Sequence, residues 1–251
     1  MNQASMKIGI IIPSTSYNRD WNTIKESYLY NHTLNSFLLT YDKQNMYKFY
    51  IGIDRNDRIY DNVDNMQIIK RFCSVMTNIE IDFIYMDNVN KGHLTVMWNK
   101  LFKIAFDDGC DYFFQCGDDI EFKTKGWISE CINQQIKHNN IGVTGPVDIN
   151  NMRLLTQSFV SRKHMELFGY YFPPEIINWY CDDWINEVYK KIGWFYPIKD
   201  QICINVGGNP RYDINNQTFK NNSDFQNKIG IMRNVCTTLV KRDLQRIKGR
   251  L

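Results

Sequence analysis

The 251-residue sequence has no apolar run of about 18 residues, the length that a membrane-spanning helix requires. Its start also lacks a basic segment leading into a long apolar stretch, which is the mark of a secretory signal. The seven cysteines include no Cys-x-x-Cys pair, and an odd number does not complete a disulfide framework. We therefore expect a soluble, cytoplasmic protein with reduced cysteines.

Glycine fingerprints for phosphate binding are absent as well. Neither Gly-x-Gly-x-x-Gly nor Gly-x-x-x-x-Gly-Lys-Ser/Thr occurs, so dehydrogenases, methyltransferases and P-loop enzymes have no support. The formal net charge is only +3, and the basic residues are scattered except near the end, so nucleic acid is not an expected partner. No repeat or low-complexity linker divides the chain, which favours one domain.

The most informative stretch is DYFFQCGDDIEF, from Asp111 to Phe122. Its bulky apolar residues predict a strand buried on both faces, as in parallel sheets covered by helices. Asp118 and Asp119 then fall at the carboxyl end of that strand, where ligands bind in open α/β sheets. Two adjacent carboxylates repel each other unless a cation neutralises them, and hard oxygen ligands favour Mg²⁺ or Mn²⁺. The alternative interpretation is a solvated turn.

Strands and helices alternate along the rest of the chain. Short β-branched or aromatic runs predict strands at Lys7–Pro13, Tyr47–Ile53 and Ile79–Met86, with further strand-like pieces at Ile141–Val147 and Gln157–Ser161. Helical spacing predicts helices within Trp21–Thr40, Met66–Met76, Leu94–Asp107, Gly126–Asn140, His164–Gly169 and Trp184–Ile192, and in a basic C-terminal segment. This alternation indicates an α/β fold.

Polar loops follow the predicted strands. The loop Ser14–Arg19 is a natural place for a nucleotide's base and ribose, with Arg19 near a phosphate, and Asp54 can accept a hydrogen bond from ribose or base. The loop Asn90–His93 opens on the same sheet edge. Each also fits an ordinary surface turn. We assign nucleotide binding to Pro13, Ser14, Thr15, Arg19, Asp54, Lys91 and Gly92.

Two later segments add candidate chemistry. Asp182 and Asp183 stand at the expected start of a helix, where the helix dipole favours ionised carboxylates. They are either helix caps or a general base that stays charged at neutral pH. In Gly207–Tyr212, two glycines and a proline next to Arg211 are typical of a mobile flap over a phosphate, although they also suit an ordinary loop.

The order of these features over roughly residues 7–212 resembles nucleotide-sugar glycosyltransferases of the GT-A fold. The most specific part is GDDIEF followed later by Asp-Asp-Trp. The resemblance implies an α/β, GT-A-type single domain over 1–251, with a mixed, mostly parallel central sheet flanked by helices. Its nucleotide-binding part would cover about 7–122 and its acceptor-binding part about 123–215, before a C-terminal helix over about 226–251.

The resemblance also implies roles for single residues. Asp119, assisted by Asp118, would hold Mn²⁺ or Mg²⁺ on the donor's diphosphate, and Asp183 would be the base, with Asp182 beside it. Two positions depart from the family's pattern, because Gly117 replaces the first Asp of a strict motif and Asn205 stands where many relatives have a metal-binding His. The remaining assignments are donor binding by Asn99, Gly117 and Arg211, and acceptor binding by Trp179 and Trp184.

The implied function is metal-dependent transfer of a sugar from a UDP- or GDP-sugar to a hydroxyl of a glycan or protein, with inversion. A non-catalytic carbohydrate- or nucleotide-sugar-binding protein of the same fold is the alternative. A nucleotidyltransferase is less favoured, because Ser14–Arg19 is not a Gly-rich loop with Arg and Lys. The segment FGYYFPPEIINWYCDDWI resembles segments of glycosyltransferases from large DNA viruses. A viral source would place the protein in a host cytoplasm or a virion.

Overall fold

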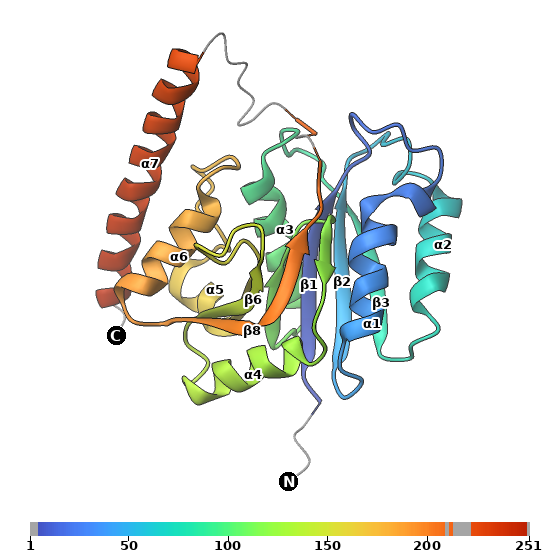
Figure 1. Cartoon of the computed structure of the whole chain (residues 1–251), viewed down its shortest axis with the longest axis horizontal. Coiled ribbons are helices and arrows are strands. Elements are labelled where there is room, and N and C mark those ends of the chain that lie inside the picture. Colours follow the sequence, from blue (N-terminus) through green and yellow to red (C-terminus); the bar gives the residue numbers. More distant parts are fainter. Residues whose placement is uncertain (1–4, 209–210, 213–221, 250–251) are drawn as a thin grey trace.

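The structure is a computed structural model, which describes residues 5–208, 211–212 and 222–249. An eight-stranded sheet forms its centre, in the order β3-β2-β1-β4-β7-β6-β8-β5 (Figure 1). The strands are β1 (Lys7–Ser14), β2 (Met46–Ile53), β3 (Ile79–Tyr85), β4 (Tyr112–Gln115), β5 (Ile120–Phe122), β6 (Val143–Asp148), β7 (Ser158–Ser161) and β8 (Phe195–Asn205). Only β5 and β7 among them run opposite to the others. The expected α/β class with a mixed, mostly parallel sheet is confirmed.

Helices cover both faces of the sheet (Figure 1). They are the 3₁₀-helix η1 (Ile24–Glu26), the π-helix η2 (Leu29–Leu34), and the α-helices α1 (Asn35–Thr40), α2 (Val63–Cys73), α3 (Leu94–Asp107), α4 (Trp127–Lys137), α5 (Arg162–Phe168), α6 (Cys181–Lys191) and α7 (Asn222–Lys248). The buried side chains of α1, α2 and α4 join one apolar cluster, and those of α3, α5, α6 and α7 join another. The sheet therefore lies between two separate cores.

Strand β1 shows why both cores are needed. Ile8, Ile10 and Ile12 are buried in one cluster and Ile11 in the other, because successive side chains of a strand point to opposite faces. A strand that is apolar on both faces must be covered on both faces, which is the pattern of parallel sheets.

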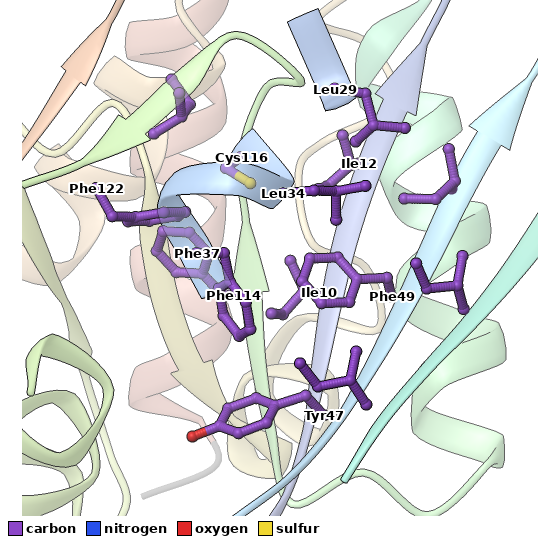
Figure 2. Close-up of a cluster of buried hydrophobic side chains, with 14 of the residues drawn as sticks. Ile10, Ile12, Leu29, Leu34, Phe37, Tyr47, Phe49, Phe114, Cys116 and Phe122 are labelled. Carbon is purple, nitrogen blue, oxygen red and sulfur yellow. The ribbon is translucent and has the colours of Figure 1, made fainter. Parts of the chain in front are cut away.

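Aromatic side chains hold together the first core, the apolar cluster under α1, α2 and α4. Figure 2 shows Phe37 of α1 beside Phe49 of β2, and their rings meet edge to face with centroids 4.9 Å apart. Phe122 of β5 stacks on Trp127 of α4 at 4.5 Å. Edge-to-face and offset-stacked pairs are the preferred geometries of aromatic rings. These contacts fix α1 and α4 on the same face of the sheet.

Two strands were not predicted. The expected apolar strand is β4, and Asp118 and Asp119 follow its carboxyl end as predicted, but a second short strand, β5, comes directly after them, so the two acids lie in the turn between β4 and β5. The turn carries the chain from the middle of the sheet to its far edge, where β5 pairs antiparallel with β8. Strand β8 was not predicted, because Pro197, Lys199 and Asp200 interrupt its apolar pattern.

The sheet joins the two parts of the chain that were expected to bind nucleotide and acceptor. Strand β4 pairs with β7, and β5 pairs with β8, so the later strands β7, β6 and β8 lie between two strands of the earlier part. Of the helices in the described part of the chain, none has both the length and the apolar character needed to cross a bilayer.

Replacing Phe37 by Ala should destabilise the fold by about 3–5 kcal/mol, because it leaves a cavity among the rings of the first core. Leu39→Ala on the same helix is the matched control, since Leu39 is 67% exposed, and it should change stability by less than about 0.5 kcal/mol. Urea denaturation followed by circular dichroism measures both values. Equal effects of the two substitutions would contradict this packing.

Candidate functional site

A cavity of about 1050 Å³ opens at the carboxyl edge of the parallel strands. Its walls come from the ends of β1, β4 and β8, the start of α6 and one side of α7. Both acidic pairs line it, Asp118–Asp119 on one side and Asp182–Asp183 on the other. Two motifs far apart in sequence therefore face one space.

Most residues assigned from the sequence line this cavity. They are Pro13, Ser14, Thr15, Arg19, Asp54, Gly92, Gly117, Asp118, Asp119, Trp179, Asp182, Asp183, Asn205 and Arg211. Lys91, Asn99 and Trp184 are not among the lining residues.

Asn99 and Trp184 make hydrogen bonds inside the protein instead. The Asn99 amide oxygen accepts from the backbone N–H groups of Tyr171 and Phe172, at 2.8 and 2.9 Å, so Asn99 holds a loop rather than a donor. Trp184 is fully buried on the inner face of α6, and its Nε1 donates to Asp243 at 3.1 Å. Helical periodicity turns Trp184 toward the core while its neighbours Asp182 and Asp183 face the cavity.

Asp118 is paired with Arg211 inside the site. Arg211 Nη1 donates to Asp118 Oδ2 at 2.9 Å, and Nη2 donates to Oδ1. The side chains are 2% and 14% exposed, so this is a buried, bidentate ion pair. Each oxygen of Asp118 therefore accepts one hydrogen bond from Arg211, and the guanidinium neutralises this carboxylate.

Asp119 is held between two glycines. A Cβ at Gly117 would overlap Asp119 Oδ1, and a Cβ at Gly207 would overlap Asp119 Oδ2. Burial raises the pKa of Asp119 to about 6, repulsion from Asp118 adds to the shift, and the Arg211 guanidinium opposes it. A carboxylate with its pKa raised in this way gains from any cation brought beside it.

Few side-chain oxygen atoms lie near Asp119, but they are of the kind that binds Mg²⁺ or Mn²⁺. In the described ranges, no three side chains of His, Cys, Asp or Glu gather into a metal site. Asn205 Oδ1 lies near Asp119, because a Cβ at Gly207 would be 3.0 Å from Asn205 Oδ1 as well as overlapping the carboxylate. One carboxylate and one amide oxygen fit a Mg²⁺ or Mn²⁺ ion that takes its other ligands from a diphosphate and water.

Asp57, which the sequence did not single out, fixes the loop after β1. It accepts from Thr15 Oγ1 at 2.9 Å and from Ser16 N and Oγ, each at 2.7 Å. Burial alone would raise its pKa, but hydrogen bonds from the backbone of Tyr60 and Ser16 outweigh burial and lower it. A stable negative charge below the loop thus sets the position of the residues expected to bind a nucleotide.

Tyr212 contacts the same loop from the other side. Its hydroxyl donates to Asp54 Oδ2 at 2.6 Å and lies 3.3 Å from Thr15 Oγ1. Its ring stacks on Tyr17 with centroids 5.0 Å apart and an interplanar angle of 9°. Arg211 and Tyr212 together therefore contact the carboxylates at the ends of β2 and β4.

The second acidic pair lies in the first turn of α6. Tyr180, in the left-handed region at φ 74°, is the N-cap, and neither Asp182 nor Asp183 caps the helix with its side chain. Burial raises the pKa of Asp182 to about 7, and repulsion from Asp183 contributes. Asp183 accepts from Arg153 Nη1 at 2.9 Å. The capping interpretation of this pair is thus not supported.

Several lining residues were missed from the sequence. They are Leu94, Met97, Trp98, Gln115, Arg153, Thr156, Gln157, Asn178, Tyr180, Cys181, Glu187, Gly208, Tyr212, Ile229, Arg233, Cys236 and Thr237. The last four belong to α7, which packs beside α6 (Figure 1). A local pattern marks only the amphipathic character of α7, and does not tell which cavity the helix reaches.

No protein-family model matches the sequence, and no curated protein matches it either. Solved structures of similar fold include S. aureus TarS, with a TM-score of 0.54 at 13% identity over 79% of this chain and 36% of that one. TarS 1–349 matches with a TM-score of 0.54 at 14% identity, and TarS 1–349 in complex with UDP with a TM-score of 0.53 at 13% identity. Each of these two matches covers 79% of this chain and 59% of the TarS chain. The likeness shows a shared fold, and it gives no support to a viral source.

Asp57→Asn should loosen the loop after β1, because an amide has one accepting oxygen where the carboxylate has two. We expect a loss of about 2–3 kcal/mol of stability, from buried donors left unpaired. The control is Asp64→Asn, an exposed acid in the first turn of α2, for which the loss should stay below about 1 kcal/mol. Guanidinium unfolding curves provide the measurement, and losses of equal size would contradict the role of Asp57.

Proposed function

We propose that this protein is a glycosyltransferase that moves a sugar from a nucleoside diphosphate to an acceptor hydroxyl. One observation carries the proposal: a single cavity joins Asp119, beside the end of β4, to Asp182 and Asp183 at the start of α6. A donor's diphosphate and an acceptor's hydroxyl need groups of this kind on opposite sides of the reacting carbon. The GT-A resemblance of the sequence, and the shared fold with TarS crystallised with UDP, agree with it.

The donor's base and ribose fit the end of the cavity beside β1 and β2. Ser14 Oγ is buried, lines the cavity and has no hydrogen-bond partner among the described residues. A base N–H or a ribose hydroxyl would replace the Tyr212 hydroxyl on Asp54. Ligands satisfy buried polar groups of this kind, since leaving one unpaired costs free energy. UDP is the first donor nucleotide to test, because TarS binds it in its crystal.

The charges of the donor end favour a bound cation. Three carboxylates line this part of the cavity and two guanidiniums oppose them, which leaves one net negative charge: Asp54, Asp118 and Asp119 against Arg19 and Arg211. A diphosphate would add further negative charge to this region. We propose that Asp119 and Asn205 hold Mn²⁺ or Mg²⁺ together with the diphosphate. When bound, the ion neutralises charge on the leaving phosphate.

The chain's own residues then account for the transfer. Asp183 accepts the proton of the acceptor hydroxyl, while the hydroxyl oxygen forms a bond to the anomeric carbon. The bond from that carbon to the diphosphate breaks, and the nucleotide leaves with the electron pair. Attack from the face opposite the diphosphate inverts the sugar's configuration. The acceptor is a glycan or protein hydroxyl, with Trp179 at its side of the cavity, and nucleic acid is not a proposed partner. A cytoplasmic location remains part of the proposal.

Asp183→Asn should lower sugar transfer by about 100- to 10,000-fold, because an amide cannot take up the acceptor's proton. Binding of UDP, measured as an increase in melting temperature with manganese, should be unchanged. Transfer is measured as release of UDP from UDP-sugars in the presence of an acceptor array, and a GDP-sugar panel runs beside it.

Full transfer activity in Asp183→Asn would remove Asp183 as the base. Nucleotide-dependent stabilisation without any transfer or donor hydrolysis would instead indicate a binding protein of the same fold. Lack of stabilisation by any nucleotide would contradict the proposal as a whole.

Gly207→Ala should weaken manganese-dependent UDP binding about tenfold or more, because its Cβ displaces the Asp119 carboxylate. Asp119→Ala should have at least the same effect. Gly208→Ala is the matched control, since its Cβ would only touch the Tyr28 hydroxyl at 3.4 Å. Calorimetric titration with UDP, with and without manganese, measures each effect. Identical binding by Gly207→Ala and Gly208→Ala would contradict a cation held by Asp119.

A further inference from the structure

The loop between β6 and β7 brings a cation onto the proposed base. Arg153 in this loop donates from Nη1 to Asp183 Oδ1 at 2.9 Å, and both residues line the cavity. Resting on the proposed function, we propose that Arg153 is a positioning residue for sugar transfer: it orients the Asp183 carboxylate and keeps the acidic pair ionised.

The loop is fixed to the helix that carries the acids. Asn186 of α6 accepts from the backbone N–H of Leu155 at 2.9 Å and donates to the carbonyl of Leu155 at 2.9 Å. Asn186 is 1% exposed, so both hydrogen bonds are buried and costly to break. Because Leu155 is two residues from Arg153, this two-point contact sets where Arg153 meets Asp183.

The same loop is also bonded to the donor end of the cavity. Asn150 Nδ2 donates to the carbonyl of Asn205 at 2.8 Å, and Thr156 Oγ1 donates to Asp148 Oδ2 at 3.1 Å. Asn205 is the residue proposed to face a cation beside Asp119. The segment that carries Arg153 is therefore held at both ends of the cavity.

The ion pair leaves room for an acceptor. Arg153 donates to one carboxylate oxygen of Asp183, and Oδ2 accepts no hydrogen bond from the described residues. A carboxylate that is fixed through one oxygen presents the other in a defined direction. Less conformational entropy is then lost when that oxygen accepts a hydrogen bond from the acceptor hydroxyl. A guanidinium suits this task, because its planar donors hold a carboxylate in one orientation.

Charge supplies the second part of the role. Asp182, buried beside Asp183, is repelled by Asp183 and Asp148, and Arg153 opposes that repulsion. The other titratable groups coupled to the pair are neutral: Tyr171, Cys181 and Cys236. Glu187 of α6 and Arg233 of α7 also line the cavity, with opposite charges. Arg153 therefore favours the doubly ionised pair, which is the form able to accept a proton.

The side chain of Arg153 is 67% exposed in the structure. Exposed ion pairs contribute little, because water screens them. An acceptor that fills the cavity would remove that water and strengthen the pair at the moment of transfer. The effect on catalysis should thus exceed the effect on stability.

The test compares Arg153→Ala with Arg153→Lys, and with Arg71→Ala as the control. Arg71 is an exposed arginine of α2, on the opposite face of the sheet. The first readout needs no substrate: ¹³C-carboxyl NMR titration of aspartates in the intact protein. In Arg153→Ala the highest aspartate pKa should move up by about 0.3–0.5 unit, because water screens an exposed ion pair in the absence of an acceptor. Arg153→Lys should shift less, and Arg71→Ala should not shift.

The second readout is the pH dependence of transfer. Without Arg153 the acidic pair takes up a proton at higher pH, and a protonated pair is less able to accept the acceptor's proton. The acid limb of kcat should therefore move up by about one unit in Arg153→Ala. At a pH below the acid limb of both proteins, kcat of Arg153→Ala should be about tenfold lower than that of the wild type. KM for the donor should be the same in both. Added guanidinium, and the lysine variant, should restore part of the rate.

An unchanged titration and an unchanged acid limb in Arg153→Ala would overturn the inference. A raised KM for the donor with kcat intact would also overturn it, because that pattern belongs to donor binding. If the wild-type protein transfers no sugar, the proposed function fails. The carboxyl titration still decides whether Arg153 controls the ionisation of the pair.

Discussion

The repulsion between Asp118 and Asp119, buried together after a strand that is covered on both faces, is the constraint on which the site depends. Two carboxylates in that position cannot both stay ionised without positive charge nearby. Arg211 supplies it for Asp118 through a bidentate pair. Asp119 keeps a raised pKa and sits in a space made by two glycines. Gly117 is therefore more than a departure from a motif, since a Cβ at that position would displace the Asp119 carboxylate.

The sheet turns this local constraint into a site with two ends. Strands β1, β2, β4 and β8 bring their carboxyl ends to one edge, so loops from distant parts of the sequence meet there. Asp57 and Tyr212 fix the loop after β1 from two sides. Asn186 and Asn205 hold the loop between β6 and β7 in the same way. The cavity is thus walled by loops that side-chain hydrogen bonds hold in position, several of them buried.

The acidic residues were found in the sequence because each follows a recognisable local pattern: a carboxylate pair after an apolar strand, or two acids before an amphipathic helix. Trp184 and Asn99 do not line the cavity. Trp184 stands next to the acidic pair, but a helix turns neighbours about 100° apart, so the acids face the cavity and Trp184 faces the core. Asn99 was assigned only through the family resemblance, and its side chain bonds the backbone of Tyr171 and Phe172. No pattern marked Arg153, and none distinguished Asp57 from Asp54 after the same strand, because a charged residue in a polar loop looks the same whether or not a partner lies beside it.

What the sequence determined alone is the α/β class, most of the strands and helices and the acids at their ends, since these depend on periodicity and on short-range turn chemistry. Only the tertiary structure decided which side chains share the cavity. The Arg211–Asp118 pair, the contact of Arg153 with Asp183 and the approach of α7 all join residues at least 30 positions apart. Their formation depends on the free energy of packing the whole sheet and its two cores, and a local window of sequence does not contain that information.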